Sequence, residues 1–474
     1  MQSIRIGCIG FAAALSACGS AEPTAQSHVF VESISVVDVQ DGVVRPAMDV
    51  WVEGNRIRAV RPTGDLAAPD GARLVDGRGR FLMPGMWDMH FHAFNQVSGR
   101  SPSEWAFPVT VAHGVTAVRE MWTKPEDMDQ VRSWRAAFAG GTVMPRIALA
   151  GTMVDGDPPA FSNAVVVRDS AEAVAAVREI IDSGTDFVKA YSMLSPGAFA
   201  VLVREAERQG IPVAGHVPIA VDVEAAARAG MASHEHLNEL IETTCSTRTE
   251  ELRAVSWDDW SMEHLQLALD TYDEGRCQAV IDVLAETGTV QVPTLVNDWM
   301  RQLSPAQLDA RFEEPWVAGM PAGDRAAWEE AREDRAGWSE ADWAANRGIY
   351  EAHVMLVELL SEAGVPIMTG TDFSNPFLYP GGSVLEELEL LVNAGLTPAA
   401  ALRAATIVPA RFASAIDSLG TIDDGMVADL VILGADPLAD IRNVRTAEEV
   451  ILNGQLLDVD QLLGLDSGPS SRDP

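Results

Sequence analysis

The sequence predicts an α/β protein in which a (β/α)8 TIM-like barrel carries a small β-sandwich built from both chain ends. Three observations support this prediction. Short apolar runs alternate with helical stretches through the middle of the chain, strand-like segments occupy both ends, and His, Lys and Asp side chains follow several of the apolar runs. The 474 residues, 47% apolar and 22% charged, suffice for a large globular core.

The first twenty residues, "MQSIRIGCIGFAAALSACGS", have the features of an export signal. Arg5 precedes an apolar stretch too short to span a bilayer, and small residues follow it. "LSAC" resembles a bacterial lipobox, which predicts a signal segment over 1–18, lipidation of Cys18 and a tether over 19–27. The alternative is an ordinary secretory signal with a chance Cys. Both alternatives export the protein, and the first makes it a periplasmic or cell-envelope lipoprotein.

The charge balance restricts the possible partners. With 69 acidic and 34 basic residues, the formal net charge is −35, spread along the chain. This charge argues against nucleic acid as a partner and against charge-driven binding to anionic lipid, because both kinds of binding need a basic surface. We therefore expect a small-molecule substrate and membrane contact only through a lipid on Cys18. The oligomeric state stays open, a homo-oligomer included.

Strand-like segments at the two ends predict the sandwich. "HVFVESISVVDVQDG", "MDVWVEGNRIRAV" and "ARLVDGRGRFL" alternate apolar and polar residues between turn residues, and the same texture returns in "GTIDDGMVADLVILG" and "AEEVILNGQLLD". The predicted sandwich covers 28–80 and 415–460, and a polar tail covers 461–474.

Residues 81–414 contain the predicted barrel. After the opening segment, seven further apolar runs are "GVTAVREM", "RIALAGTMV", "DFVKAY", "IPVAGHVP", "GMASHEHL", "TVQVPTL" and "VPIMTGTD". Helical stretches such as "SAEAVAAVREIIDSG", stopped by Gly, separate them. An acidic insert at 297–350 carries five Trp residues. The insert either forms a lid or substrate wall, or its Trp residues pack it on itself.

Polar residues fall at corresponding positions of five predicted strands. His90 and His92 share a face of the first, because strand side chains repeat every two residues. Burying such groups is costly without a chemical purpose, and the carboxyl ends of barrel strands carry catalytic residues. The set predicts a metal site and comprises His90, His92, Lys189, His216, a His of "SHEH", and Asp372.

These motifs resemble those of the amidohydrolase superfamily. The resemblance rests on "PGMWDMHFH", "GVTAVRE", "AGLTPAAALRAAT" and "LGTIDDGMVADLVIL", together with the split sandwich. With Lys189 on strand four, the sequence resembles the branch of imidazolonepropionase-related and prolidase-like enzymes. In that branch the strand-four Lys is carboxylated by carbon dioxide and bridges two metals. The resemblance implies that His90, His92 and Asp372 hold the buried metal, His216 and His236 the outer one, and Lys189 links them.

The donor set suits two divalent cations, most simply zinc. Imidazole and carboxylate ligands without Cys leave coordination positions open to water. Burial favours the neutral Lys189 amine that a carbamate requires. Two ions about 3.5–4 Å apart would share a hydroxide. Asp372 would serve as general base and then as general acid in the cleavage of an amide bond, in dipeptides or N-acyl amino acids.

Four further residues near the predicted ligands are candidates for supporting roles. His234 and His236 have the same strand parity, so the resemblance alone favours His236 as the ligand. Tyr191 is a candidate for contact with the scissile carbonyl or a substrate carboxylate, the alternative being a core tyrosine. Arg119 is a candidate for binding a substrate carboxylate, the alternative being an ion pair with a nearby acid. Asp88 is expected to support the ligands from deeper in the strand.

Other functions remain open on the sequence. A single-metal deaminase or cyclic amidohydrolase would share the fold but would lack the bridging Lys. A lactone or phosphotriester hydrolase would use the same hydroxide. A non-catalytic binding lipoprotein is disfavoured because each expected ligand is present. Cys245 and Cys277 could pair in an oxidising compartment, but spacing alone does not show whether they do.

Overall fold

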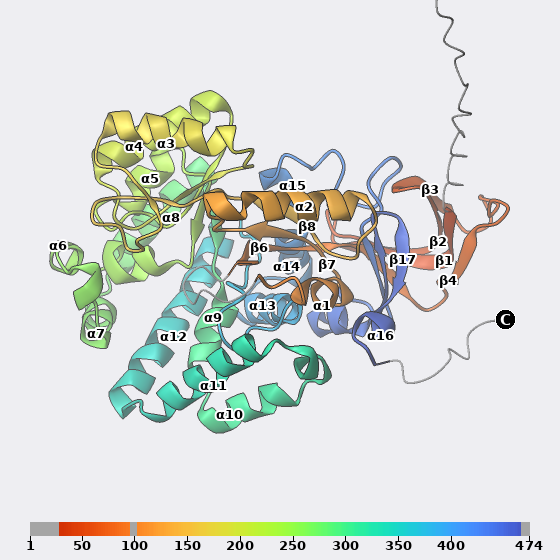
Figure 1. Ribbon diagram of the computed structural model, residues 1–474. Coiled ribbons are helices and arrows are strands. Elements are labelled where there is room, and N and C mark those ends of the chain that lie inside the picture. Colours follow the sequence, from red (N-terminus) through yellow and green to blue (C-terminus); the bar gives the residue numbers. More distant parts are fainter. Residues whose placement is uncertain (1–27, 95–101, 466–474) are drawn as a thin grey trace, which may run out of the picture.

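The computed structural model describes residues 28–94 and 102–465 (Figure 1). The predicted signal segment, Cys18, the tether and most of the predicted tail lie outside the described residues. Within the described part, a β-sheet lies at one side of the molecule and an α/β body fills the rest (Figure 1). None of the described helices is long and apolar enough to cross a membrane.

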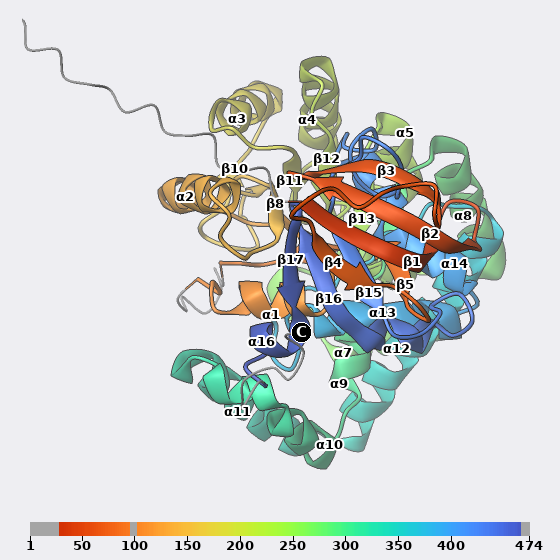
Figure 2. The ribbon, with the colours of Figure 1, turned by 90° about the vertical axis from the view of Figure 1, so that its right-hand side faces the viewer.

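Eight strands from the two ends of the chain form one hydrogen-bonded sheet. Figure 2 shows the first five strands beside the last three. They are β1 (His28–Asp38), β2 (Val43–Glu53), β3 (Arg56–Pro62), β4 (Arg73–Asp76), β5 (Phe81–Pro84), β15 (Leu430–Leu433), β16 (Ala447–Leu452) and β17 (Gln455–Asp458). One apolar cluster joins residues from both ends, including Val31, Leu82 and Ile432. The ends therefore share a core, as expected for a composite β-domain.

Three details of this sheet differ from the prediction. The strands follow one continuous order, β17-β16-β15-β5-β1-β2-β3 with β4 also on β1, where two sandwiched sheets were expected. β5 belongs to this sheet because it pairs with β1 and β15, so the body begins at β6 rather than at residue 81. The predicted tail begins inside α16 (Val459–Leu462), whose first turn Asp458 caps through its side chain.

The body is built on short parallel strands. They are β6 (Met86–Phe91), β7 (Val115–Glu120), β8 (Arg146–Leu149), β9 (Val154–Asp155), β10 (Val165–Val166), β11 (Val188–Ala190), β12 (Val213–Gly215), β13 (Ser233–Glu235) and β14 (Val290–Val292). β6, β7 and β8 form one sheet, and β9 to β14 form another in the order β10-β9-β11-β12-β13-β14.

Isolated parallel bridges connect the two sheets of the body. Ala150 pairs with Phe187 beside β8 and β11, Gln291 of β14 pairs with Ile367, and Phe91 of β6 pairs with Phe373. Followed in order, the parallel pairings thus lead from β6 around to the segment 367–373 and back to β6. This cyclic order is the one that the predicted barrel requires.

The predicted eighth strand is not a regular strand. Between its two bridges, the backbone N–H of Thr371 donates to the Asp88 carboxylate (3.0 Å) instead of to a neighbouring backbone carbonyl. Asp372 then donates its N–H to the carbonyl of His90 (2.7 Å). The side chain of Asp88 therefore fixes the segment that carries Asp372.

Helices surround these strands, and their ends follow the sequence signals. Ser195 caps α4, Pro196 is its first residue, and Gly210 ends it with φ 74°. The longer helices are α2 (Met128–Ala139), α3 (Ser170–Asp182), α4 (Pro196–Gln209), α7 (Met262–Asp270), α8 (Glu274–Thr287), α11 (Ala322–Ala336), α12 (Glu340–Glu362), α13 (Gly382–Asn393) and α14 (Pro398–Ala405). The shorter ones are α1 (Ala106–Ala112), α5 (Val223–Ala229), α6 (Thr249–Arg253), α9 (Leu295–Arg301), α10 (Pro305–Asp309) and α15 (Ile407–Phe412).

The insert at 297–350 is helical and lies along α9 to α12 at the lower edge of Figure 1. Within the insert, Trp316 meets Trp328 edge-on at 6.2 Å, and the two rings also contact Tyr379 (5.1 Å) and Phe377 (4.9 Å) outside it. Trp338 and Trp343 contact each other at 4.9 Å. The tryptophans therefore pack the insert, which was one of the two alternatives.

Cys245 and Cys277 form a disulfide, which settles the pairing that spacing left open. Cys245 follows the helical turn Leu240–Thr244 after β13, and Cys277 lies on α8. The bond therefore ties the loop that leaves β13 to the helix that precedes β14. Disulfides of this kind persist in oxidising compartments.

We expect the disulfide to stabilise the fold by restricting the unfolded chain. For a sequence separation of 32 residues, its loss in a Cys245→Ser, Cys277→Ser variant should lower the free energy of unfolding by about 3.7 kcal/mol. Urea unfolding of both proteins, with and without a reductant, measures the difference. Equal stability under non-reducing conditions would show that the bond contributes nothing.

Candidate metal centre and catalytic cavity

The six predicted ligand side chains line one cavity of about 340 Å³. His90 lies on β6 and Lys189 on β11, whereas the other four follow the strand ends or bridges. The six side chains are those of His90, His92, Lys189, His216, His236 and Asp372. Residues from distant parts of the sequence thus converge at one end of the parallel strands.

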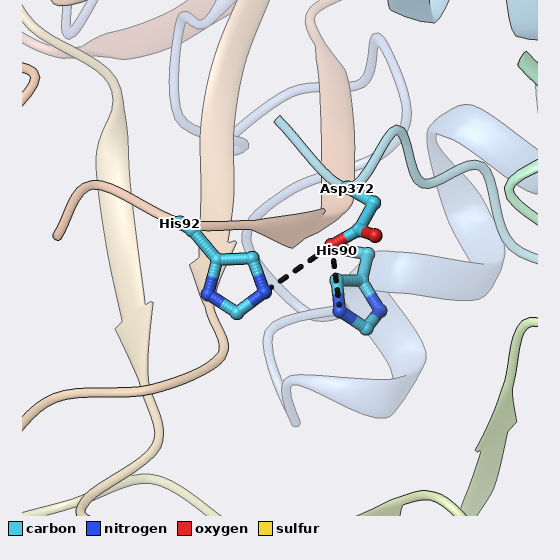
Figure 3. Close-up of side chains that lie close together, drawn as sticks. All are labelled: His90, His92 and Asp372. Carbon is cyan, nitrogen blue, oxygen red and sulfur yellow. Dashed lines mark ion pairs between the residues drawn. The ribbon is translucent and has the colours of Figure 1, made fainter. Parts of the chain in front are cut away.

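Three of the six side chains form a tight group. Oδ1 of Asp372 lies 3.5 Å from Nε2 of His90 and 3.3 Å from Nε2 of His92 (Figure 3). One ligand atom from each of the three residues lies within 4.8 Å of the others. The spacing suits a single ion held by two imidazoles and a carboxylate.

The other two histidines of the set, His216 and His236, lie next to this group. The ring of His236 lies 4.4 Å from that of His90, and the ring of His216 lies 5.1 Å from that of His236. Lys189 is buried, with Nζ 5.5 Å from the ring centre of Tyr191. The cavity therefore presents a second pair of imidazoles beside the first group, and a lysine lies in the same cavity.

Left-handed backbone turns place two of these side chains. His236 has φ 71° and Asp372 has φ 65°, a region that non-glycine residues seldom occupy. At His236 this turn breaks the strand alternation on which sequence parity relies. His236 lines the cavity, whereas the buried His234 contacts Gln291 (3.0 Å) and Glu239 (2.7 Å).

Glu239 is a site residue that the sequence analysis missed. Its carboxylate lies 2.7 Å from Nε2 of His234 and 3.6 Å from Nδ1 of His216. Burial alone would raise the pKa of Glu239, but its contacts with the two histidines hold that pKa well below its ordinary value. The sequence signal that could have pointed to Glu239 is its position three residues after the predicted ligand His236. The hydroxyl of Ser192 is the hydrogen-bond partner of Nδ1 of His216 at 3.2 Å, and Glu239 places its negative charge beside the same nitrogen.

A fully buried ion pair lies under the cavity. Arg119 on β7 donates from Nη2 to both carboxylate oxygens of Glu235 on β13 at 2.7 Å, and from Nη1 to Ser233 at 2.9 Å. Oε2 of Glu235 also lies 2.9 Å from Nδ1 of His90. Both charged side chains have no exposed surface. Glu235 thus fixes the orientation of His90, with Nε2 directed toward Asp372.

The prediction that Arg119 binds substrate is therefore wrong. Its guanidinium is fully used by Glu235, Ser233 and the carbonyl of Met89 (2.5 Å), and it does not line the cavity. The ion pair with a nearby acid was the alternative. Tyr191, in contrast, does line the cavity, with its ring 4.3 Å from that of His216.

Asp88 supports the site from below, as expected. Its Oδ1 accepts hydrogen bonds from the N–H groups of His90 (3.2 Å) and Thr371 (3.0 Å), and its Oδ2 accepts one from the Thr371 hydroxyl (2.6 Å). Burial raises the pKa of Asp88 to about 7. This residue therefore connects the segments that carry His90 and Asp372.

The protonation states suit metal binding. Burial lowers the pKa of His90 and His92, and lowers that of His236 to about 3, so these rings are neutral at pH 7. Burial alone would raise the pKa of Asp372, but the neighbouring histidines hold it well below its ordinary value. Burial lowers the pKa of Lys189 to about 8. Neutral imidazoles and an ionised carboxylate are the forms that bind a cation.

The residues present fit a metal. Nε2 of His90 is buried and has no hydrogen-bond partner among the described residues, and it lies on the side of the ring that faces Asp372. Such an atom is unfavourable unless something else occupies its lone pair. A divalent cation held by His90, His92 and Asp372 would satisfy it.

Helix α9 supplies polar side chains that the sequence analysis did not single out. The amide of Asn297 donates to Oδ2 of Asp372 at 3.0 Å, and Asn375 donates to the same oxygen at 2.6 Å. Asp298 and Arg301 also line the cavity. The insert therefore contributes a wall through α9, although none of its five tryptophans lines this cavity.

We expect Glu235→Ala to destabilise the protein by about 3–5 kcal/mol, because it leaves the buried Arg119 charge without its partner. It should also weaken metal binding about 10–100-fold, because His90 loses its orienting acceptor. Urea unfolding of the metal-free protein and metal titration measure the two effects.

The matched control is the double variant Arg119→Met, Glu235→Met. Replacing both charges by apolar groups should restore most of the stability of the metal-free protein but not the metal affinity. If the double variant bound metal as tightly as the unsubstituted protein, the orienting role of Glu235 would be wrong.

Solved structures with known folds resemble the chain over nearly its full length. A bottromycin amidohydrolase matches with a TM-score of 0.73 and 26% identity, covering 94% of this chain and 90% of that one. A Xaa-Pro dipeptidase crystallised with methionine matches with a TM-score of 0.65 and 20% identity, covering 91% of this chain and 100% of that one, and shows a shared fold alone.

Curated sequences resemble shorter parts of the chain. Ochratoxinase of Aspergillus niger is 32% identical over 108 residues, which is 22% of each chain. Adenine deaminase of Chelativorans sp. (strain BNC1) is 29% identical over 214 residues, 42% of this chain and 33% of that protein. These alignments therefore span a third or less of each curated relative. The model of the amidohydrolase family, however, matches residues 81–457, and the chain belongs to that family of hydrolases acting on carbon–nitrogen bonds.

Proposed function

We propose that the protein is an exported, metal-dependent hydrolase that cleaves the amide bond of dipeptides or N-acyl amino acids. The observation that carries the proposal is the convergence of six ligand-type side chains on one cavity, with Asp372 held between the histidines. The cyclic order of parallel pairings supports a (β/α)8 barrel as the frame, since barrel enzymes act at the carboxyl ends of their strands.

Two divalent cations, proposed as zinc, would be held by this set. His90, His92 and Asp372 would hold one, His216 and His236 the other, and Lys189 as a carbamate would link them. When bound, the ions supply a water of lowered pKa and polarise the scissile carbonyl. The prolidase-like branch of the family and the lowered pKa of Lys189 support the carbamate.

Asp372 would move the proton in the reaction. Asn297 and Asn375 both donate to Oδ2 of Asp372, so that Oδ1 is directed toward His90 and His92. In this orientation the carboxylate would accept a proton from the attacking water and return it to the leaving amine. The two amides would keep the carboxylate from rotating between these steps.

Two further side chains would bind the substrate. Burial raises the pKa of Tyr191, so its phenol stays protonated and would donate a hydrogen bond to the carbonyl oxygen. Arg301, exposed at the end of α9 and lining the cavity, takes the place that the sequence analysis gave to Arg119. Its guanidinium would bind the carboxylate of the substrate.

Export remains part of the proposal and rests on two supports. The N-terminal sequence carries the lipobox-like motif around Cys18. The disulfide between Cys245 and Cys277 suits an oxidising compartment such as the periplasm.

We expect Asp372→Asn to lower kcat at least about 10³-fold against N-acyl amino acids and dipeptides, because the amide cannot accept the proton. The measurement is a hydrolysis screen with zinc-loaded protein, together with the metal content of each variant. Turnover of lactones or phosphotriesters alone, or deamination of adenine alone, would contradict the proposed amide hydrolysis. Unchanged turnover in the Asn variant would contradict the role of Asp372.

We expect Arg301→Ala to raise KM about tenfold for substrates that carry a carboxylate, because a charge-assisted hydrogen bond is lost. The corresponding amides without the carboxylate should show unchanged KM. Arg347→Ala is the matched control, since Arg347 is exposed on α12 and does not line the cavity. An equal change in KM for substrates with and without the carboxylate would show that Arg301 does not bind the carboxylate.

A further inference from the structure

One wall of the cavity is aromatic, and the proposed reaction does not explain it. The rings of Trp122, Phe161, Tyr191 and Trp257 all line the cavity, and we call this set the aromatic wall. The ring of Phe161 lies 5.2 Å from that of Trp122 and 5.7 Å from that of Tyr191. Trp257 lies 6.2 Å from Tyr191 and 6.4 Å from Phe161. The four rings therefore form one contiguous surface.

The aromatic wall begins at the metal centre and extends to the surface. The ring of Tyr191 lies 4.3 Å from that of His216, and Trp257 at the other end is 39% exposed. The exposed part of Trp257 is apolar surface that a bound apolar group could cover. A ring bound against Phe161 and Trp257 would lie close to a carbonyl bound beside His216.

The aromatic wall is held in place before any substrate binds. Asp155 of β9 is buried, and its Oδ1 accepts a hydrogen bond from the N–H of Met193, two residues after Tyr191 (2.6 Å). Its Oδ2 accepts one from the N–H of Ala160, next to Phe161 (2.8 Å). One carboxylate thus fixes two of the loops that carry the rings, which reduces the ordering needed on binding.

A second part of the cavity lining is polar and belongs to α9. Asn297 donates to Asp372, and Arg301 lies one helical turn further along the same face. Asp372, which would protonate the leaving amine, is therefore on the side of Arg301. The amino-acid half of the substrate, with its carboxylate, would bind there.

We infer that the aromatic wall receives the acyl half of the substrate, so that the enzyme prefers amides whose acyl group carries an aromatic ring. This inference rests on the proposed amide hydrolysis and names its substrate class: N-arylacyl amino acids, or dipeptides with an aromatic first residue. The ring would lie against the face that Phe161 and Trp257 form together, while Arg301 binds the carboxylate of the leaving amino acid.

The test compares zinc-loaded enzyme on N-phenylacetylalanine, N-acetylalanine and N-acetylphenylalanine. We expect kcat/KM to be at least about tenfold higher for the phenylacetyl substrate than for N-acetylalanine. N-acetylphenylalanine should gain little, because its ring is on the amine side. A preference for N-acetylphenylalanine over N-phenylacetylalanine, or no preference between the acyl groups, would overturn the inference.

Substitutions in the aromatic wall test whether the preference for the phenylacetyl group arises there. Trp257→Ala and Phe161→Ala should each lower kcat/KM about five- to tenfold more for the phenylacetyl substrate than for N-acetylalanine. Trp257→Phe keeps a ring and should retain most of the preference. Trp343→Ala, in the insert and outside the cavity, is the matched control and should change neither value.

Binding of the acid product separates this inference from the proposed function. Phenylacetate should bind the zinc-loaded enzyme at least about tenfold more tightly than acetate, and Trp257→Ala should remove the difference. If no amide is hydrolysed but this difference in affinity is found, the proposed reaction is wrong and the binding role of the aromatic wall is supported. If amides are hydrolysed and the two acids bind equally, the aromatic wall fails and the reaction stands.

Discussion

The buried contact of Glu235 with Arg119 and His90 is the constraint on which the site depends. Charged groups under a cavity cannot be solvated, so each needs a partner with good geometry. Glu235 meets that need for Arg119 with both carboxylate oxygens and also accepts from Nδ1 of His90. Because these residues come from β13, β7 and β6, the ion pair fixes the relative positions of three strands and the direction of one ligand.

The strands and the loops divide the chemistry between them. The strands and the turns at their ends hold the ligand set, through Glu235, Asp88 and the left-handed turns at His236 and Asp372. The loops and α9 form the two walls, one aromatic and one polar. A frame held by the strands can stay the same while the walls vary, and the walls are therefore where substrate preference is set.

Sequence reasoning selected six candidate ligands that line one cavity, but it did not identify their hydrogen-bond and ion-pair partners. His90 and His92 follow strand parity and both reach the cavity. Parity failed at His236, because a left-handed turn there reverses the direction of the side chain. Arg119 was misassigned because its partner, Glu235, lies 116 residues away on a neighbouring strand. Local patterns report which face a residue occupies, whereas the partner of a buried charge depends on the order of strands in space.

The role of α9 shows why an insert can matter to a reaction that it does not perform. Buried Glu387 on α13 accepts hydrogen bonds from the N–H groups of Leu295 (3.1 Å) and Val296 (2.7 Å), at the start of the helix. His353 on α12 contacts Asp298 at 2.7 Å. Two helices outside the cavity therefore hold α9 so that Asn297 reaches Asp372. A change that shifts α9 would disturb the contact of Asn297 with Asp372, the carboxylate proposed to move the proton, so α12 and α13 act on the proposed site through their packing against α9.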